Sequence, residues 1–279
     1  MRFHTLHSAA RTLGIAAILL LVLPAGPLAA QQAAALDNAA ADRTALDNAA
    51  HARRLLEQMK QALGGDLWLQ MPNYEWWGTS AEFFHGTPNG IRTQFWYFHQ
   101  VPDQDRWEFT RHRDDVQIIG STQGWEITYR GLHALPKDQL QDILRRRAHS
   151  LETVMRHWFP DSRTLLTYDG QQLAERHLAD QVTLLSADND SVTLQLDAQT
   201  HLPLRRIFRW RDPVYKDKNQ EVEEYDNYRV VDGISTPYSI TEYHNGEMTR
   251  EIFLLGAEYD RSLPADEFDP QATARRIVK

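Results

Sequence analysis

The stretch DNYRVVDGISTPYSITEYHNGEMTREIFLLG, residues Asp226 to Gly256, decides the fold, because it predicts three β-strands joined by two tight turns. Asp232-Gly233 and Asn245-Gly246 are typical hairpin dipeptides, since both residues of each pair tolerate positive φ. Residues that favour strands lie between and beyond the turns: Val230, Ile234, Tyr238, Ile240, Ile252 and Leu254. The C-terminal part of the chain therefore predicts an antiparallel meander.

Strand patterns of the same kind continue toward the N-terminus and are interrupted once. They occupy residues 66–131 and 163–210, with turns rich in Gly, Pro and Asn between them. Residues 136–159 instead show a helical period, with a bend expected at His149-Ser150 and an apolar stripe formed by Leu140, Ile143, Leu144, Leu151, Val154, Met155 and Trp158. Another helix is expected from Asp47 to the glycine pair at residues 64–65. Residues 47–279 thus predict one α+β domain, mainly antiparallel β, of about ten strands.

The N-terminus predicts a signal peptide over residues 1–30. Arg2 and Arg11 supply a positive start. The apolar core from Ile15 to Leu23 is far shorter than the roughly 20 residues that a membrane-spanning helix needs. Small residues at the end of the segment offer the cleavage point, and an uncleaved anchor is the alternative. Residues 31–46 contain ALDNAA twice in a run poor in large apolar side chains, which predicts a mobile leader.

Charge and cysteine content restrict the environment and the partners. The formal net charge of −8 argues against a nucleic-acid partner bound through a basic surface, and against docking on anionic lipid headgroups. The absence of cysteine excludes disulfides and a lipid attached to an N-terminal cysteine. With the signal peptide removed, no transmembrane segment is expected. The predicted product is a soluble exported protein, periplasmic in a bacterium with two membranes.

No sequence pattern specifies catalytic residues, a cofactor or a metal site. The twelve histidines include no H-x-x-x-H pair, and no G-x-S-x-G motif is present. Carboxylates at 223–226 and 266–269 are candidates for a glycosidase pair, but solvated strand faces and turns explain them as well. The run Arg145-Arg146-Arg147 predicts a charged helix face, with an anion or partner site as the alternative. We therefore expect a protein that is not an enzyme and carries no cofactor.

Aromatic residues indicate what the sheet encloses. In RTQFWYFHQ, Phe95 and Tyr97 point to one face of the strand while Trp96 and Phe98 point to the other. A strand with one solvated face would alternate, so this sheet has apolar material on both faces. It is either covered by helices and a loop or partner, or strongly curved around an apolar cavity. For the second case, the ligand-binding candidates are Trp76, Tyr97, Phe109, Trp125 and Trp210.

Three segments resemble a known family. LDAQTHLPLRR (Leu196–Arg206) is similar to a strand-turn-strand segment of the LolA/LolB-like superfamily of exported lipoprotein carriers. YRVVDGISTPYSI (Tyr228–Ile240), followed by a final strand and then by LPADEFDP (Leu263–Pro270), is similar to the C-terminal portion of those sequences. The resemblance covers about Asn48 to Pro270. It implies a strongly curved half-barrel with helices covering the concave face, and a cavity that accepts a lipid or lipoprotein acyl chain. An envelope protein is a further candidate partner. The alternatives are an enzyme acting on cell-envelope carbohydrate and a non-catalytic scaffold with a filled core.

Overall fold

The computed structural model describes residues 27–278 apart from 91, 175 and 213, with side chains from residue 40 onward. The predicted signal peptide therefore lies almost entirely outside the described residues. The chain divides into two compact units between Ala45 and Leu46. Helix α1 (Pro27–Leu63) begins in the first unit and ends in the second. Residues 31–46, for which the sequence predicts a mobile leader, are thus helical, and their mobility stays a prediction.

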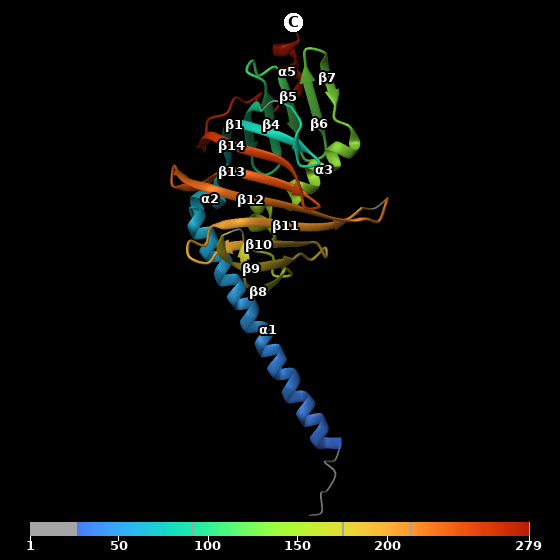
Figure 1. Cartoon of the computed structure of the whole chain (residues 1–279), viewed down its shortest axis with the longest axis vertical. Helices are drawn as coiled ribbons and strands as arrows, with labels where there is room; N and C mark the ends of the chain where they lie inside the picture. The colour runs from blue at the N-terminus through green and yellow to red at the C-terminus, as the bar shows by residue number, and fades with distance from the viewer. Residues whose placement is uncertain (1–26, 91, 175, 213, 279) are drawn as a thin grey trace, which may run out of the picture. The chain divides into compact units, whose positions relative to one another are not determined.

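The second unit is built on one antiparallel sheet of fourteen strands (Figure 1). The strands are β1 (Asn73–Phe84), β2 (Thr87–Pro88), β3 (Thr93–Gln100), β4 (Gln104–Phe109), β5 (Asp115–Ile119), β6 (Gly124–Thr128), β7 (Gly131–Ala134), β8 (Leu165–Ala174), β9 (His177–Leu185), β10 (Ser191–Asp197), β11 (Pro203–Arg211), β12 (Lys218–Val231), β13 (Ile234–His244) and β14 (Glu247–Tyr259). Their order is β7-β6-β5-β4-β3-β1-β14-β13-β12-β11-β10-β9-β8, with β2 paired to β1. The sheet is open, with β7 and β8 at its edges.

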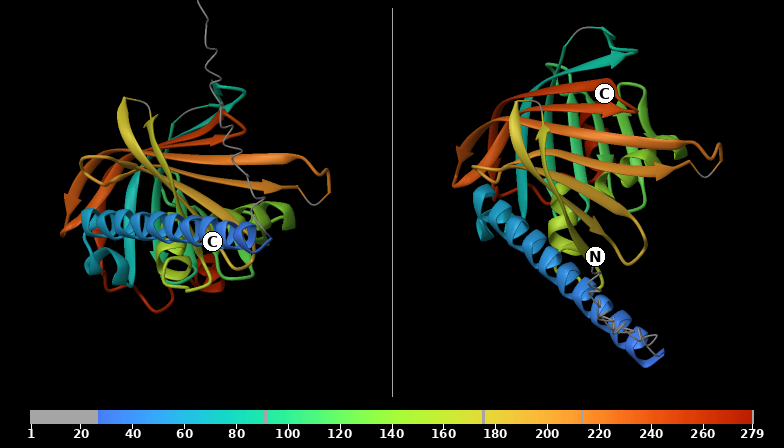
Figure 2. Two further views of the ribbon diagram at one scale, coloured as in Figure 1. Left: turned by 90° about the horizontal axis from the view of Figure 1, so that it is seen from below. Right: turned by 60° about the horizontal axis from the view of Figure 1, so that its bottom comes forward.

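The sheet arches over short helices, as Figure 2 shows. These are α2 (Asp66–Gln70), α3 (Lys137–Ala148), α4 (Leu151–Thr153) and the π-helical turn η1 (Val154–Trp158). Helix α5 (Pro270–Ile277) packs on the opposite face, against Val116 and Ile118 of β5. The predicted α+β half-barrel is confirmed, although it has fourteen strands instead of about ten. The excess includes β2, of two residues, and β7, of four, which are too short to show an alternating pattern. In the described residues, no helix is both long and apolar enough to cross a membrane.

Both turns of the opening segment form as predicted. Val231 pairs with Ile234 and His244 pairs with Glu247, which leaves two-residue loops between β12, β13 and β14. Asp232 and Gly233 have φ of 51° and 84°, and the Asn245-Gly246 pair has 52° and 84°. These values are those of a type I′ turn, whose twist matches that of the flanking strands.

The predicted helices also form, with two corrections. The mid-chain helix breaks at His149-Ser150 as expected, and the Ser150 side chain accepts a hydrogen bond from Thr153 N to start α4. Residues 66–70, predicted as strand, form α2, which buries Trp68. Helix α5 was not predicted, although Asp269 followed by Pro270 is a helix-start signature and the Asp269 carboxylate accepts from the N–H of Gln271 and Ala272.

The main core lies between α1, η1 and the sheet. The expected face of α1 is buried: Ala52, Leu55, Leu56, Met59 and Leu63. It packs in one cluster with residues such as Leu184, Leu194 and Phe208. Asn48 fixes α1 to the edge strand β8, because its side-chain amide donates to Tyr168 O at 2.8 Å and accepts from Tyr168 N at 2.8 Å. The helix thereby satisfies the backbone of an edge residue as a neighbouring strand would.

Candidate functional site

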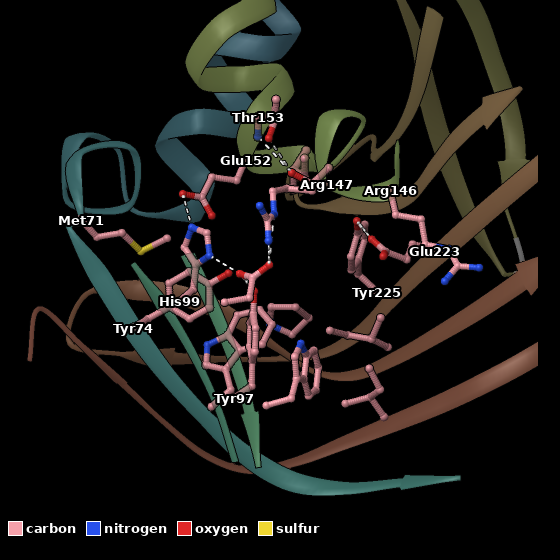
Figure 3. Close-up of a pocket in the computed structure, with 18 of the residues that line it drawn as sticks. Met71, Tyr74, Tyr97, His99, Arg146, Arg147, Glu152, Thr153, Glu223 and Tyr225 are labelled. Atoms are coloured by element: carbon pink, nitrogen blue, oxygen red, sulfur yellow. Dashed lines mark hydrogen bonds and ion pairs between the residues drawn. The ribbon is translucent and has the colours of Figure 1, made fainter. Parts of the chain in front are cut away.

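A cavity of about 340 Å³ lies on the concave side of the sheet. Strands β1, β3, β4, β5, β12, β13 and β14 contribute to its wall, and α2 to η1 contribute the opposite side. Its aromatic lining is Trp68, Tyr74, Trp76, Phe95, Tyr97, Trp107, Phe109, Tyr225, Tyr228 and Tyr259. Figure 3 shows Tyr74 and Tyr97 on one side of the cavity, with Arg147 and Glu152 of the helices facing them. The cavity is therefore the candidate binding site.

The structure brings three of the five sequence candidates to this cavity. Trp76, Tyr97 and Phe109 line it, and their contact with a ligand stays a prediction. Trp125 is not among the lining residues, because it packs instead on a separate cluster that includes Ile127. Trp210 is also absent from the lining, and its ring lies 3.5 Å from the guanidinium carbon of Arg145.

Trp107 is a lining residue that the sequence analysis missed. It lies two residues before Phe109 on β4, and side chains at i and i+2 share a face. The choice of Phe109 therefore implied Trp107 as well. Tyr74 lies two residues before Trp76 on β1, so the choice of Trp76 implied Tyr74 in the same way.

Neighbouring strands place these rings in a continuous aromatic wall. Trp76 pairs in register with Tyr97, and Tyr97 pairs with Trp107. The Tyr97 and Trp107 ring centroids are 4.2 Å apart, and those of Trp107 and Phe109 are 6.1 Å apart with planes only 8° from parallel. Each such pair contributes about 0.5–1.5 kcal/mol beyond area burial. The wall is thus held by the sheet itself and needs no ligand to form.

A first polar cluster joins α3 to the strands. Asp105 accepts a hydrogen bond from Tyr97 Oη at 2.8 Å and lies 2.6 Å from His99 Nδ1. Arg147 Nε donates to the same carboxylate at 3.1 Å, and Arg147 Nη1 donates to the carbonyls of Asp103 and Gly120 at 2.8 Å each. Burial disfavours the charged form of Asp105, but the bond to His99 and the charge of Arg147 outweigh it and lower the pKa. Asp105 is therefore held as an anion and is poorly suited to act as a general acid.

The helices add a carboxylate on the other side of His99. Glu152 Oε1 lies 3.7 Å from His99 Nε2, a contact drawn in Figure 3. The same oxygen lies 2.9 Å from Arg156 Nε. Burial, followed by the charges of Glu152 and Asp105, raises the pKa of Tyr74 well above its ordinary value. The phenol is therefore neutral. Each charge in the cluster has a partner of opposite sign, which favours a structural role over proton transfer.

A second polar feature crosses five strands. Five residues occupy successive register positions, and we call them the charge row: Glu82, Arg250, Glu242, Glu223 and Arg206. Arg250 Nη2 donates to Glu242 Oε1 at 2.5 Å. Glu223 accepts from Arg206 Nε at 3.1 Å and from Tyr225 Oη at 2.5 Å. Cross-strand neighbours of opposite charge stabilise a sheet, whereas the adjacent pair Glu242 and Glu223 relies on the arginines beside it.

The charge row includes Glu223, one of the carboxylates considered for a glycosidase pair. Burial opposes ionisation of Glu223, but Arg206 outweighs it and lowers the pKa of that carboxyl. Glu224 accepts from Arg205 Nε at 2.6 Å. A glycosidase acid needs a raised pKa, whereas that of Glu223 is lowered. No group of three or more potential metal ligands occurs in the residues that the structure describes.

Comparisons by sequence find no matching family model and no curated relative. Solved structures do match. A DUF1329 family protein from Desulfovibrio piger superposes with a TM-score of 0.58 at 12% identity, over 81% of this chain and 99% of that one. A domain named for outer membrane lipoprotein sorting, from Vibrio parahaemolyticus, gives a TM-score of 0.54 at 10% identity, over 82% and 100%. The chain has a LolA-like fold. At these identities the likeness concerns the fold alone, and the cavity must supply the functional argument.

Proposed function

We propose that this protein is an exported, non-enzymatic carrier that holds an acyl chain, free or attached to a lipoprotein, in the cavity under the half-barrel. The observation that carries the proposal is the cavity of about 340 Å³ beside a preformed aromatic wall. Small-molecule sites are concave, mostly apolar and largely preformed, with volumes of roughly 300–1,000 Å³. The cavity lies at the lower end of that range, which suits a single chain.

Area burial is sufficient to hold such a chain. Each methylene removed from water contributes about 0.8 kcal/mol, before the cost of association and of ordering the ligand is subtracted. The wall residues Trp76, Tyr97, Trp107 and Phe109 all lie on consecutive strands β1, β3 and β4, so an extended chain can contact them together. Binding of this kind requires no catalytic group.

The two alternatives have less support. A filled-core scaffold would bury these aromatic rings, whereas Trp76, Tyr97, Trp107 and Phe109 are only partly buried and face the cavity. An enzyme would need an activated group, but the carboxylates at the cavity, such as Asp105 and Glu223, are paired with cations and held ionised. Residues 1–30 favour export, and with it the periplasm.

Native mass spectrometry of the protein purified from its own host tests the proposal. We expect a population heavier than the chain by the mass of a lipid or acylated molecule, and loss of that mass after extraction with organic solvent. If only the bare chain is found, and the purified protein also fails to bind added fatty acid, the carrier function is rejected in favour of the scaffold.

A further inference from the structure

The three consecutive arginines of α3 have different surroundings. Arg145 stacks on Trp210, and Arg147 binds Asp105. Arg146 lines the cavity, and its nearest carboxylate oxygen, Oε2 of Glu221, is 3.6 Å from its Nε, too far for a hydrogen bond. The other oxygen of Glu221 lies 2.9 Å from His244 Nδ1. Nε of Arg145 also has no partner, but Arg145 does not line the cavity. Arg146 is thus the cavity-lining arginine of this run that has no carboxylate oxygen within hydrogen-bond distance.

Some hydrogen-bond donors at the cavity have no acceptor. Among the described residues that line it, three buried side-chain polar atoms have no hydrogen-bond partner, and all three are arginine Nε–H groups: Arg146, Arg156 and Arg250. Arg156 Nε lies 2.9 Å from Glu152 Oε1, so the charge of Arg156 is neutralised. Buried unpaired polar groups are rare and call for a partner. A ligand that supplies oxygen acceptors would satisfy Arg146 and Arg250.

Arg250 connects this polar end to the aromatic wall. Its Nη2 binds Glu242, its Nε is one of the unpaired donors, and its guanidinium carbon is 5.6 Å from the ring centroid of Trp107. The side chain of Arg146 is 41% exposed, which places it toward solvent. An amphiphile whose chain lies on the wall would therefore carry its head group to these two arginines.

We propose that Arg146 and Arg250 bind the anionic head group, a carboxylate or a phosphate, of an amphiphile whose chain occupies the cavity. This inference rests on the proposed carrier function and specifies its substrate class. The guanidinium groups would donate charge-assisted hydrogen bonds to the head-group oxygens. They would do so without displacing Glu242 from Arg250, because the unpaired Nε–H is the donor that remains.

Carboxylates at the same place oppose an anion, and Glu82 is the most informative of them. It is exposed at the end of the charge row, opposite Arg250 in register. Partial desolvation raises the pKa of Glu82, with Arg250 opposing the rise, Glu242 adding to it and Arg146 opposing it. Both arginines therefore act on this carboxylate. Removal of its charge should leave them more available to a ligand.

Isothermal titration calorimetry with dodecyl phosphate, dodecanol, dodecyltrimethylammonium and inorganic phosphate tests the proposal on the mature protein. We expect dodecyl phosphate to bind about tenfold or more tightly than dodecanol, the effect of one charge-assisted hydrogen bond. Arg146→Gln should remove most of this difference and leave dodecanol binding unchanged. Arg145→Gln, the same change of charge one residue earlier, is the matched control and should keep the difference.

Glu82→Gln should tighten dodecyl phosphate binding several-fold, a gain that misfolding cannot produce. Equal binding of dodecyl phosphate and dodecanol to the wild type would overturn the inference and leave the carrier function intact. Tighter binding of dodecyltrimethylammonium, or inorganic phosphate binding as well as dodecyl phosphate, would also overturn it. If none of the amphiphiles binds, the carrier function itself fails.

Discussion

Truncation of Phe109 and of Phe208 should have different effects on stability, because Phe109 lines the cavity and Phe208 fills the core. Phe208 is 1% exposed, stacks on His149 with ring centroids 4.5 Å apart and does not line the cavity. Phe208→Ala should therefore cost about 3–5 kcal/mol in the free energy of unfolding, through lost transfer energy and the void left behind. Phe109 is only partly buried and faces the cavity, so Phe109→Ala should cost roughly 1–2 kcal/mol.

Ligand binding should respond in the opposite order. Phe109→Ala removes part of the aromatic wall and should weaken binding of a fluorescent fatty acid about fivefold, which corresponds to about 1 kcal/mol of lost apolar burial. Trp125→Ala truncates an aromatic residue of the same sheet outside the cavity, and should lower stability without changing affinity. Urea unfolding and probe titration on the three variants provide both quantities. If Phe109→Ala unfolds as readily as Phe208→Ala and Trp125→Ala weakens binding equally, the assignment of the cavity as the binding site is refuted.

Four further predictions concern charge, metal and processing. Because the folded-state pKa of Asp105 is lowered, the contribution of Asp105 to stability is present above about pH 4 and is lost as the pH falls further. In Asp105→Asn, the urea concentration at the midpoint of unfolding should therefore fall less steeply as the pH is lowered below about 4. Arg206→Met leaves the partly buried Glu223 without the cation that it binds and should cost about 2–3 kcal/mol by urea unfolding, whereas adding Glu223→Leu should recover much of the loss. Chelation with EDTA should leave the melting temperature unchanged, and a drop of several degrees would contradict the prediction that the fold holds no metal. N-terminal sequencing of the exported protein should begin near Gln31, and a sequence beginning at Met1 would reject cleavage.

The local parts of the fold follow directly from short patterns. Asp232-Gly233 and Asn245-Gly246 determine two turns because their conformation depends on the residues themselves. The apolar stripe of α1 and the break at His149-Ser150 are local as well. Residues 66–70 were wrongly predicted as strand, because five residues show no period and Gly65 can begin a helix as readily as a loop.

The candidate site depends on contacts between residues far apart in the chain, which short sequence patterns do not predict. The cavity joins residues from strands far apart in the chain, and the charge row requires the register of four strand pairs at once. A strand's pattern also leaves undecided which face is concave, and an error of one position moves a residue such as Trp125 to the wrong side. Arg146 could be suspected from the basic run, but only the positions of Trp210 and Asp105 single it out from its neighbours.

The two hydrogen bonds between the Asn48 side chain and the Tyr168 backbone have a consequence for self-association. A β-strand at the edge of a sheet can recruit the same strand of another molecule, and β8 carries the exposed Leu165 and Leu173 that would favour such growth. Asn48 occupies the backbone donor and acceptor of Tyr168 with one amide, at the middle of that edge. Pairing of another strand with β8 at Tyr168 would therefore require Asn48 to leave first, and with it this part of α1. The variant Asn48→Leu, with the half-barrel still intact, would be expected to aggregate faster than the parent chain.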